Sequence, residues 1–224
     1  MKTTFASPAL PLRRRLLGAG AAAAAGSLLG NAWANTDYPA KPITVVVPYA
    51  PGGQGDVFAR LVGERLGRAL GQPVIIDNRP GATGALGTRQ VAKAKGDGYT
   101  LLLGQTGEIA VNGSAMKNPG YDALKDLRPM ALVGNAPLVL VAPAAAPFNS
   151  LAELVQLARS KPGSVSYASS GTATPGHLAA AALALATKTD MVHVPYKGAG
   201  QAITDVIGGQ VQFFFSSASA IMHT

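Results

Sequence analysis

The sequence contains no cysteine, which excludes disulfide bridges and thiolate chemistry. Aromatic residues make up only 6% of its 224 residues, and the basic residues are scattered along the chain. A nucleic-acid-binding surface would need a clustered basic face, often with stacking aromatics, so we exclude that class. Without disulfides the fold must be held by its hydrophobic core, and the chain is long enough to build one.

Signatures of common enzyme sites are also missing. The sequence has no phosphate-binding Gly-x4-Gly-Lys-Ser/Thr, and Gly81-x-x-Gly84-x-x-Gly87 lacks the dinucleotide spacing. No Gly-x-Ser-x-Gly elbow occurs, although residues 169–171 follow a predicted strand. The histidines show no metal-ligand spacing, and His177 and His193 are interpreted as packing or hydrogen-bonding residues. We therefore predict a protein that is not an enzyme and that needs no metal or cofactor.

The first 34 residues have the organisation of a secretory signal peptide. Three arginines at 13–15 precede an apolar stretch of Ala, Gly and Leu at 16–30. This stretch is too short and too rich in Gly and Ala for a membrane span, and Ala32-Trp33-Ala34 fits a cleavage site. We expect export to the periplasm and a mature chain that begins near Asn35 without a membrane span. Consecutive arginines suit the twin-arginine route, and the Sec route stays open.

Loss of this segment leaves only a mild positive charge. Lys2 and the three arginines are four of the 19 basic residues, which leaves 15 basic against 11 acidic residues. A balance of this size is compatible with a small anionic ligand.

After residue 35, short apolar runs alternate with amphipathic stretches. Runs bounded by Gly or Pro are typical of buried strands, and they lie at residues 43–47, 74–76, 100–103, 131–133, 138–141, 165–167, 192–194 and 211–215. Helical spacing predicts helices at residues 56–70, 83–93, 151–159, 175–187 and 201–207. The alternation predicts an α/β fold of parallel sheets that helices cover on both faces.

Glycine-rich loops follow four of the predicted strands. They lie at residues 48–56, 77–84, 168–177 and 195–200. Glycine lets the backbone approach a ligand closely, and a helix N-terminus offers unpaired N–H groups and a positive dipole end. Because the carboxyl ends of parallel strands meet in a crevice, these loops predict an anion-binding crevice. Acidic residues at helix starts, such as Asp56, are interpreted first as caps.

Several of these loops carry motifs of a known receptor family. In chain order they are Pro48-Tyr49-Ala50-Pro51-Gly52-Gly53-x-x-Asp56, Asn78-Arg79-Pro80-Gly81-Ala82-x-Gly84, Asp97-Gly98-Tyr99-Thr100-Leu101 and His193-Val194-Pro195-Tyr196-Lys197-Gly198. Over residues 38–217 the sequence resembles the receptors of tripartite tricarboxylate transporters, the Bug-type periplasmic binding proteins. Ala180-Ala181 and Lys188 depart from the family's pattern, but they lie along and beyond a predicted helix, away from the loops.

The resemblance implies a two-lobed α/β clamshell of the type II periplasmic-binding-protein kind. Lobe 1 would span residues 35–135 and lobe 2 residues 136–224, with the ligand held between them. Backbone N–H groups, hydroxyls and water would bind its carboxylate without a salt-bridging arginine. The implied ligand-binding residues are Gly52, Gly53, Gln54, Asp56, Gln105, Thr106, Ser169, Ser170, Gly171, Thr174, His177, Tyr196, Gly198 and Ser216.

The function implied is that of a monomeric periplasmic receptor for a small carboxylate. The ligand would be a di- or tricarboxylate, an acidic amino acid or an aromatic acid, delivered to the membrane permease subunits of a tripartite transporter. The alternatives are an exported α/β hydrolase or isomerase, and a ligand sensor for a membrane kinase. The resemblance leaves the identity of the ligand open.

The resemblance also raises an expectation about the first lobe. Family members continue with a strand that returns to this lobe and with helices that cover it. We therefore expect the C-terminal part of lobe 1 to be missing, which would expose an apolar face and an unpaired strand edge. A fragment or truncated form would bind weakly or not at all when expressed alone, and a chain that functions as it stands is the alternative.

The export hypothesis is tested by N-terminal sequencing of periplasmic material. We expect a sequence that starts near Asn35, and a chain that still begins at Met1 would contradict the cleavage site. Replacement of Arg13 and Arg14 by Lys should block export only in the twin-arginine route. Unchanged export of that variant would identify the Sec route.

Overall fold

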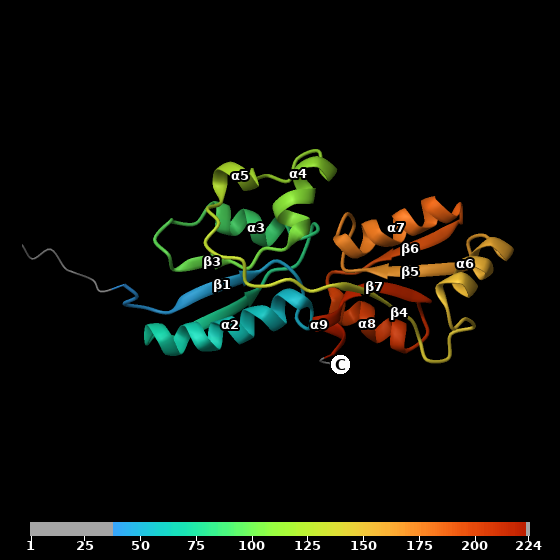
Figure 1. Cartoon of the computed structure of the whole chain (residues 1–224). Coiled ribbons are helices and arrows are strands. Elements are labelled where there is room, and N and C mark those ends of the chain that lie inside the picture. Colours follow the sequence, from blue (N-terminus) through green and yellow to red (C-terminus); the bar gives the residue numbers. More distant parts are fainter. Residues whose placement is uncertain (1–37, 223–224) are drawn as a thin grey trace, which may run out of the picture. The chain divides into compact units, whose positions relative to one another are not determined.

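The computed structural model describes residues 38–222, so the predicted signal peptide at 1–34 lies outside the described residues. The described chain forms two separate β-sheets covered by helices (Figure 1). The first has the strand order β2-β1-β3, and the second the order β4-β7-β5-β6. Within the described residues, no helix is long and apolar enough to span a membrane. The predicted α/β class is confirmed.

The first sheet is parallel and centres on β1 (Ile43–Val47). β2 (Val74–Asn78) and β3 (Thr100–Leu102) flank it, with Val45 opposite both Ile76 and Leu101. Because helices cover both faces of a parallel sheet, its central strand is a nearly continuous apolar run, interrupted only by Thr44. α2 (Gln54–Leu70) and α3 (Ala85–Ala92) lie on opposite faces (Figure 1).

Small residues form the face that α2 turns toward the first sheet. Gly55, Ala59 and Gly63 are buried, whereas Leu61 is 54% exposed. A Cβ at Gly63 would lie 3.2 Å from both the Val74 and the Ile76 side chains. The missing side chains therefore let α2 pack closely on β2, and the left-handed Gly71 ends the helix.

The second sheet is mixed. β5 (Val165–Ser169) pairs in parallel with β6 (Met191–Pro195) and β7 (Phe213–Ser217), whereas β4 (Leu138–Val141) runs antiparallel to β7. The prediction of purely parallel sheets is therefore wrong for β4. Its direction needs no crossover helix, because an antiparallel strand can enter a sheet directly from a preceding extended segment.

Alternating side chains of the second sheet fill two cores. Phe213 packs with Leu154 of α6 (Leu151–Ser160) and Ala180 of α7 (Pro175–Thr187). Phe214 points to the other face and packs with Ile203 of α8 (Ala199–Ile207). This follows from the two-residue period of a strand, which sends successive side chains to opposite faces.

Most predicted elements are present, with ends that shift by one or two residues at most. The run at 131–133 is the exception, because residues 127–137 form neither helix nor strand and Leu132 is 79% exposed. The sequence also missed a π-helical turn at Gly107–Val111 (η1) and the short helices α4 (Asn112–Ala115), α5 (Ala123–Asp126) and α9 (Ala218–Ile221).

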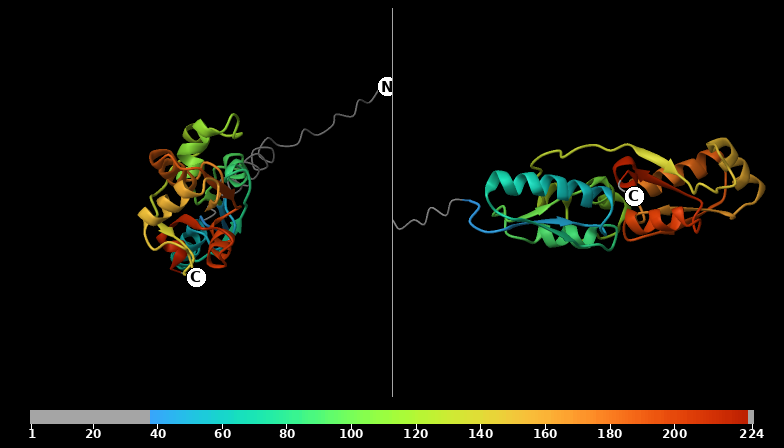
Figure 2. Two further views of the ribbon diagram at one scale, coloured as in Figure 1. Left: turned by 90° about the vertical axis from the view of Figure 1, so that its right-hand side faces the viewer. Right: turned by 90° about the horizontal axis from the view of Figure 1, so that it is seen from below.

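Residues 127–137 connect the two sheets (Figure 2). An apolar run becomes a strand only where its backbone groups find pairing partners. The described residues offer no strand pairing to 131–133, which explains its irregular course. The predicted lobe boundary between residues 135 and 136 falls in this segment, and the division into 35–135 and 136–224 stays a prediction.

Packing of α6 on the second sheet is tested by Leu154→Ala. Leu154 is fully buried beside Val165 and Phe213, so its truncation should cost about 2–5 kcal/mol of unfolding free energy. Leu151 on the same helix is 52% exposed, and Leu151→Ala should cost only about 0.5 kcal/mol. Urea unfolding of both variants measures the difference, and equal losses would contradict this packing.

Candidate ligand-binding cavity

A cavity of about 500 Å³ lies among loops from both sheets. This volume suits a small-molecule ligand. The cavity combines polar groups such as Gln54, Gln105 and Ser170 with apolar side chains such as Phe58 and Ile109. Within residues 38–222, none of the side chains that line the cavity is acidic, basic or a histidine. Any charge on a ligand would therefore be met by neutral dipoles.

Three helices begin at the cavity wall. Gly53, Gln54 and Gly55 at the start of α2 line it, together with Gly176 near the start of α7 and Ala199 at the start of α8. The first N–H groups of a helix have no partner within the helix, and the helix dipole places a partial positive charge there. Three such ends around one cavity without charged lining side chains among the described residues would suit an anion.

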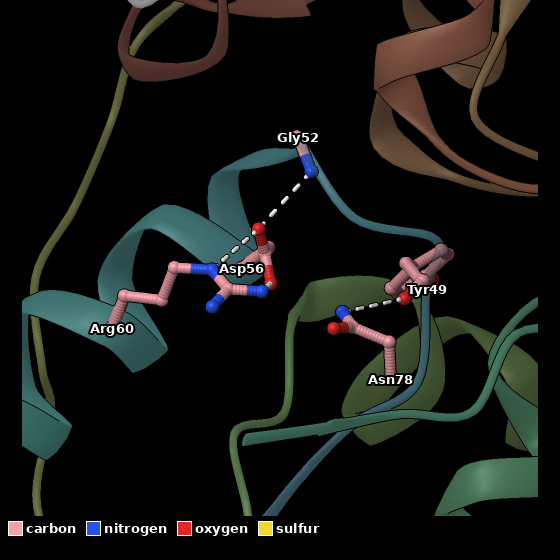
Figure 3. Close-up of polar contacts among 5 residues, drawn as sticks. All are labelled: Tyr49, Gly52, Asp56, Arg60 and Asn78. Carbon is pink, nitrogen blue, oxygen red and sulfur yellow. Dashed lines mark hydrogen bonds and ion pairs between the residues drawn. The ribbon is translucent and has the colours of Figure 1, made fainter. Parts of the chain in front are cut away.

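The loop between β1 and α2 is shaped by Asp56 (Figure 3). The Gly52 N–H donates to Asp56 Oδ2 at 3.1 Å, and Arg60 Nε donates to the same oxygen at 3.0 Å. Burial raises the pKa of Asp56, but hydrogen bonds from Arg60 and Gly52 outweigh it and hold the pKa below its ordinary value. Gly52 has a φ of 84°, a conformation that favours glycine. The N-cap of α2 is Gly53, so Asp56 is not the cap itself but fixes this loop from the first turn of the helix.

Two buried hydroxyls brace the loop after β5. Ser169 Oγ accepts from the Gly171 N–H at 3.2 Å and lies 3.0 Å from the Gly171 carbonyl oxygen. Thr174 Oγ1 donates to the same carbonyl at 2.7 Å. Ser169 and Thr174 are almost fully buried, and neither lines the cavity. Their role in the structure is to position the neighbouring Ser170 on the wall.

His177 and His193 stack beside this loop, with ring centroids 4.0 Å apart. His193 Nε2 lies 2.6 Å from Ser169 Oγ, and the Ala173 N–H donates to His177 Nδ1 at 3.0 Å. Burial lowers the pKa of both rings, that of His193 to about 4, so both are neutral at pH 7. The Ser169–His193 contact is part-buried and neither residue lines the cavity, which fits packing and hydrogen bonding rather than nucleophilic catalysis.

Tyr196 binds α8, whereas Gly198 lies where two loops meet. Tyr196 Oη donates to Asp205 Oδ2 at 2.6 Å, and burial together with this contact raises the pKa of Tyr196 to about 12. The Ala50 N–H donates to the Lys197 carbonyl at 3.2 Å. A Cβ at Gly198 would lie 2.9 Å from Ala50 Cβ. The loops after β1 and β6 therefore meet backbone to backbone.

The structure thus divides the ligand-binding residues implied by the resemblance into two groups. Those on the cavity wall are Gly53, Gln54, Gln105, Thr106, Ser170 and Ser216. Those that support the loops without lining the wall are Gly52, Asp56, Ser169, Gly171, Thr174, His177, Tyr196 and Gly198. Contact of either group with a ligand stays a prediction.

Ser216 on the cavity wall has a buried hydroxyl group without a hydrogen-bond partner among the described residues. Its side chain is only 2% exposed. A buried hydroxyl without a partner costs about 1–3 kcal/mol. A polar group on the ligand would satisfy it.

Sequence reasoning missed part of the wall. Tyr49, Phe58, Asn135 and Phe215 line the cavity as well. Tyr49 belongs to the first family motif, and this motif could have identified it as a residue of the cavity wall. Asn135 lies in a segment with an irregular course, and no periodic pattern marks its side chain as inward-facing.

The family model of the tripartite tricarboxylate transporter family receptor matches residues 58–223. The chain belongs to this receptor family. Membership confirms the resemblance seen in the loop motifs, and because the family consists of binding receptors, it also confirms that the chain is not an enzyme.

Curated relatives of this receptor come from several bacteria. The chain is 40% identical over 186 residues to the protein BugT of Bordetella pertussis, with 83% of this chain and 57% of BugT covered. It is 38% identical over 208 residues to a protein from the tcbD–tcbE intergenic region of a Pseudomonas species, with 93% of this chain and 61% of that protein covered. The receptor chain thus spans less than two thirds of the length of these relatives.

Solved structures of the family agree with the fold. The chain superposes with a TM-score of 0.80 on Rpa4515 of R. palustris with adipate, at 34% identity and with 82% of this chain and 62% of that chain covered. The TM-score is 0.77 on MatC of Rhodopseudomonas palustris with bound malate, at 32% identity and with 82% of this chain and 63% of MatC covered. For the periplasmic binding protein BugD the TM-score is 0.76 at 35% identity, with 80% of this chain and 60% of the BugD chain covered. The two-lobed periplasmic-binding-protein fold is confirmed.

The backbone contact between the loops is tested by Gly198→Ala. The added methyl group would press against Ala50, so the loops must separate, and we expect a clear fall in melting temperature. A Cβ at the exposed Gly96 would meet nothing within 4 Å, so Gly96→Ala is the matched control with an unchanged melting temperature. Melting temperatures are measured by circular dichroism. Equal values for both variants would show that the loops at Gly198 and Ala50 are not in tight contact.

Proposed function

We propose that the chain is the periplasmic solute-binding receptor of a tripartite tricarboxylate-type transporter and that it binds a small carboxylate in the cavity. The observation that carries this proposal is the meeting of three helix N-termini on an uncharged wall. Fixed N–H dipoles of this kind bind anions without a basic side chain. Family members with adipate and with malate support the carboxylate class.

The wall has two chemical halves that suit such a ligand. Amide and hydroxyl groups of Gln54, Gln105 and Ser170 accompany the helix N-termini and would bind the carboxylate. Phe58, Leu102, Ile109 and Phe215 are apolar and would contact the carbon chain. The ligand should therefore carry an anionic end on a short apolar body.

The wall also discriminates among the candidate acids. An acidic amino acid carries an ammonium group, which a buried site usually pairs with a carboxylate. Within the part of the chain that the structure describes, the cavity lining includes no acidic side chain. This favours a simple di- or tricarboxylate or an aromatic acid over an acidic amino acid.

Delivery of the ligand is part of the same proposal. We place the receptor in the periplasm, exported by its N-terminal segment and acting as a monomer that docks on the membrane permease subunits. Closure of lobes 35–135 and 136–224 around the ligand would present the loaded form to the permease. Family membership and the neighbours' fold support this role.

The ligand class is tested by titrating the purified chain with malate, adipate and an aromatic acid such as benzoate. Calorimetry up to millimolar ligand detects weak binding, and a ligand at 100 times its dissociation constant should raise the unfolding free energy by about 2.7 kcal/mol. Glutamate serves as the amino-acid comparison and should bind more weakly. Absence of binding to every carboxylate would reject the proposed function.

The position of the carboxylate is tested by Gly53→Val and Ser170→Ala. Gly53 has extended backbone angles that valine accepts, and a Cβ there meets Ala199 only at ordinary contact distances. The variant should thus fold while its branched side chain narrows the gap between the starts of α2 and α8, and affinity should fall sharply.

The Ser170→Ala variant should lose about 0.5–1.5 kcal/mol of binding free energy, and up to about 3 if the hydroxyl bonds the charged group. Ser160 is an exposed residue on α6 that does not line the cavity, so Ser160→Ala is the control and should bind normally. Unchanged affinity in both Gly53→Val and Ser170→Ala would place the carboxylate elsewhere.

A further inference from the structure

Glu108 is a fully buried carboxyl group directly behind the cavity wall. Its side chain is 0% exposed. Tyr49 Oη donates to its Oε2 at 2.9 Å, and the Gln105 N–H donates to its Oε1 at 2.6 Å. Both donors belong to residues that line the cavity. One hydrogen bond therefore joins this carboxyl group to each of two residues of the cavity wall.

The backbone around Glu108 strengthens this link. It lies in the π-helical turn η1, between wall residues Thr106 and Ile109. Such turns are rare and frequently occur at functional sites. Tyr121 Oη donates to the Glu108 carbonyl at 2.6 Å, which holds the turn from outside. The position of Glu108 is thus fixed on several sides.

We propose that Glu108 couples ligand binding to proton uptake, so that a carboxylate enters the cavity together with a proton that binds this residue. The inference rests on the proposed carboxylate function and adds a regulation of the same site. Glu108 would not contact the ligand. It would act through Gln105 and Tyr49, as a positioning residue whose charge opposes that of the ligand.

The electrostatics around Glu108 favour this coupling. Burial raises its pKa to about 7, and the hydrogen bonds from Gln105 and Tyr49 offset only part of this effect. The titratable groups that face it are Tyr49 and Tyr121, both with pKa values raised chiefly by burial. Arg89 on α3 acts on Tyr121, and no basic group is among the causes that shift Glu108. A second negative charge in the cavity would thus repel the ionised form without compensation.

The direction of the linkage follows from these charges. The bound anion raises the pKa of Glu108 above its ligand-free value of about 7, so binding takes up a proton. Affinity therefore rises as the pH falls through neutrality. A rise of one pKa unit on binding gives about a sixfold gain in affinity between pH 8.5 and pH 6.5. The pKa values of His177 and His193 lie below the ordinary value of 6.5, so these groups titrate mainly below this window.

The test is calorimetry with malate and adipate as probes, across this pH window and in two buffers of different ionisation enthalpy. The wild-type chain should show the rise in affinity and a net uptake of protons. Glu108→Gln mimics the protonated form, so it should bind at pH 8.5 about as tightly as the wild type does at pH 6.5, with a flat profile. A merely structural role predicts loss of affinity at every pH instead.

Two further variants keep the result decisive. Tyr49→Phe removes a hydrogen bond that lowers the pKa of Glu108, so its affinity profile should shift to higher pH even where Glu108→Gln fails to fold. Glu64 is an exposed acid on α2, and Glu64→Gln should keep the wild-type profile. A flat wild-type profile, or a loss of affinity at every pH in Glu108→Gln, overturns the coupling and leaves the proposed function standing.

A ligand-free measurement separates the two proposals. Because the folded state holds the proton of Glu108 more tightly than the unfolded state does, the free energy of unfolding should fall as the pH rises from the ordinary pKa of 4.5 to about 7. Glu108→Gln should lack this part of the fall, and an identical profile in both proteins would overturn the inference. If no carboxylate binds at any pH, the proposed function fails and the coupling fails with it.

Discussion

The backbone-to-backbone contact between the loops after β1 and β6 is the constraint on which the site depends. A Cβ at Gly198 or Gly200 would lie within 3 Å of Ala50 or Pro51, respectively. Only glycine permits this approach, and it brings the first residues of α2 and α8 next to each other. Larger side chains at these glycines would hold the starts of α2 and α8, which help to form the cavity, apart.

A second layer of residues keeps those helix starts in place. Asp56 fixes the loop before α2, and the hydroxyls of Ser169 and Thr174 fix the loop before α7. Each uses its polar atoms on neighbouring backbone groups, so the loops before α2 and α7 are held by contacts within the protein. A preorganised set of dipoles does not have to reorient when an anion arrives, and this strengthens binding.

Much of the architecture was predictable from the sequence because strands and loops carry local signals. The run at 43–47 is mostly apolar, and prolines and glycines follow it at 48–53, so both the strand and the loop after it could be recognised. The supporting role of Ser169 and Thr174 could not, because the sequence does not show whether a hydroxyl turns toward the ligand or its own loop. Glu108 gave no signal either, since an isolated acid in a short helical stretch normally lies on the surface.

The irregular course of residues 127–137 was also beyond local reasoning. The apolar run at 131–133 has the composition of a strand, yet a strand exists only through pairing with another one. Pairing is decided by segments far away in the chain. The same limit applies to the direction of β4, which depends on how the chain arrives at the second sheet rather than on the residues of the strand itself.

The uncharged cavity wall has a consequence for how this kind of receptor diversifies. Under the proposed function its attraction for an anionic end would come from helix backbones, which a point substitution leaves in place. Phe58, Leu102 and Ile109 line the remainder of the wall, and substitutions there change volume and shape without disturbing that anchor. If the ligand binds as proposed, ligand preference could therefore drift among acids of different length and bulk while the anchoring chemistry is inherited unchanged. The fold thus places the anchoring helix starts and the variable apolar side chains on different parts of the cavity wall.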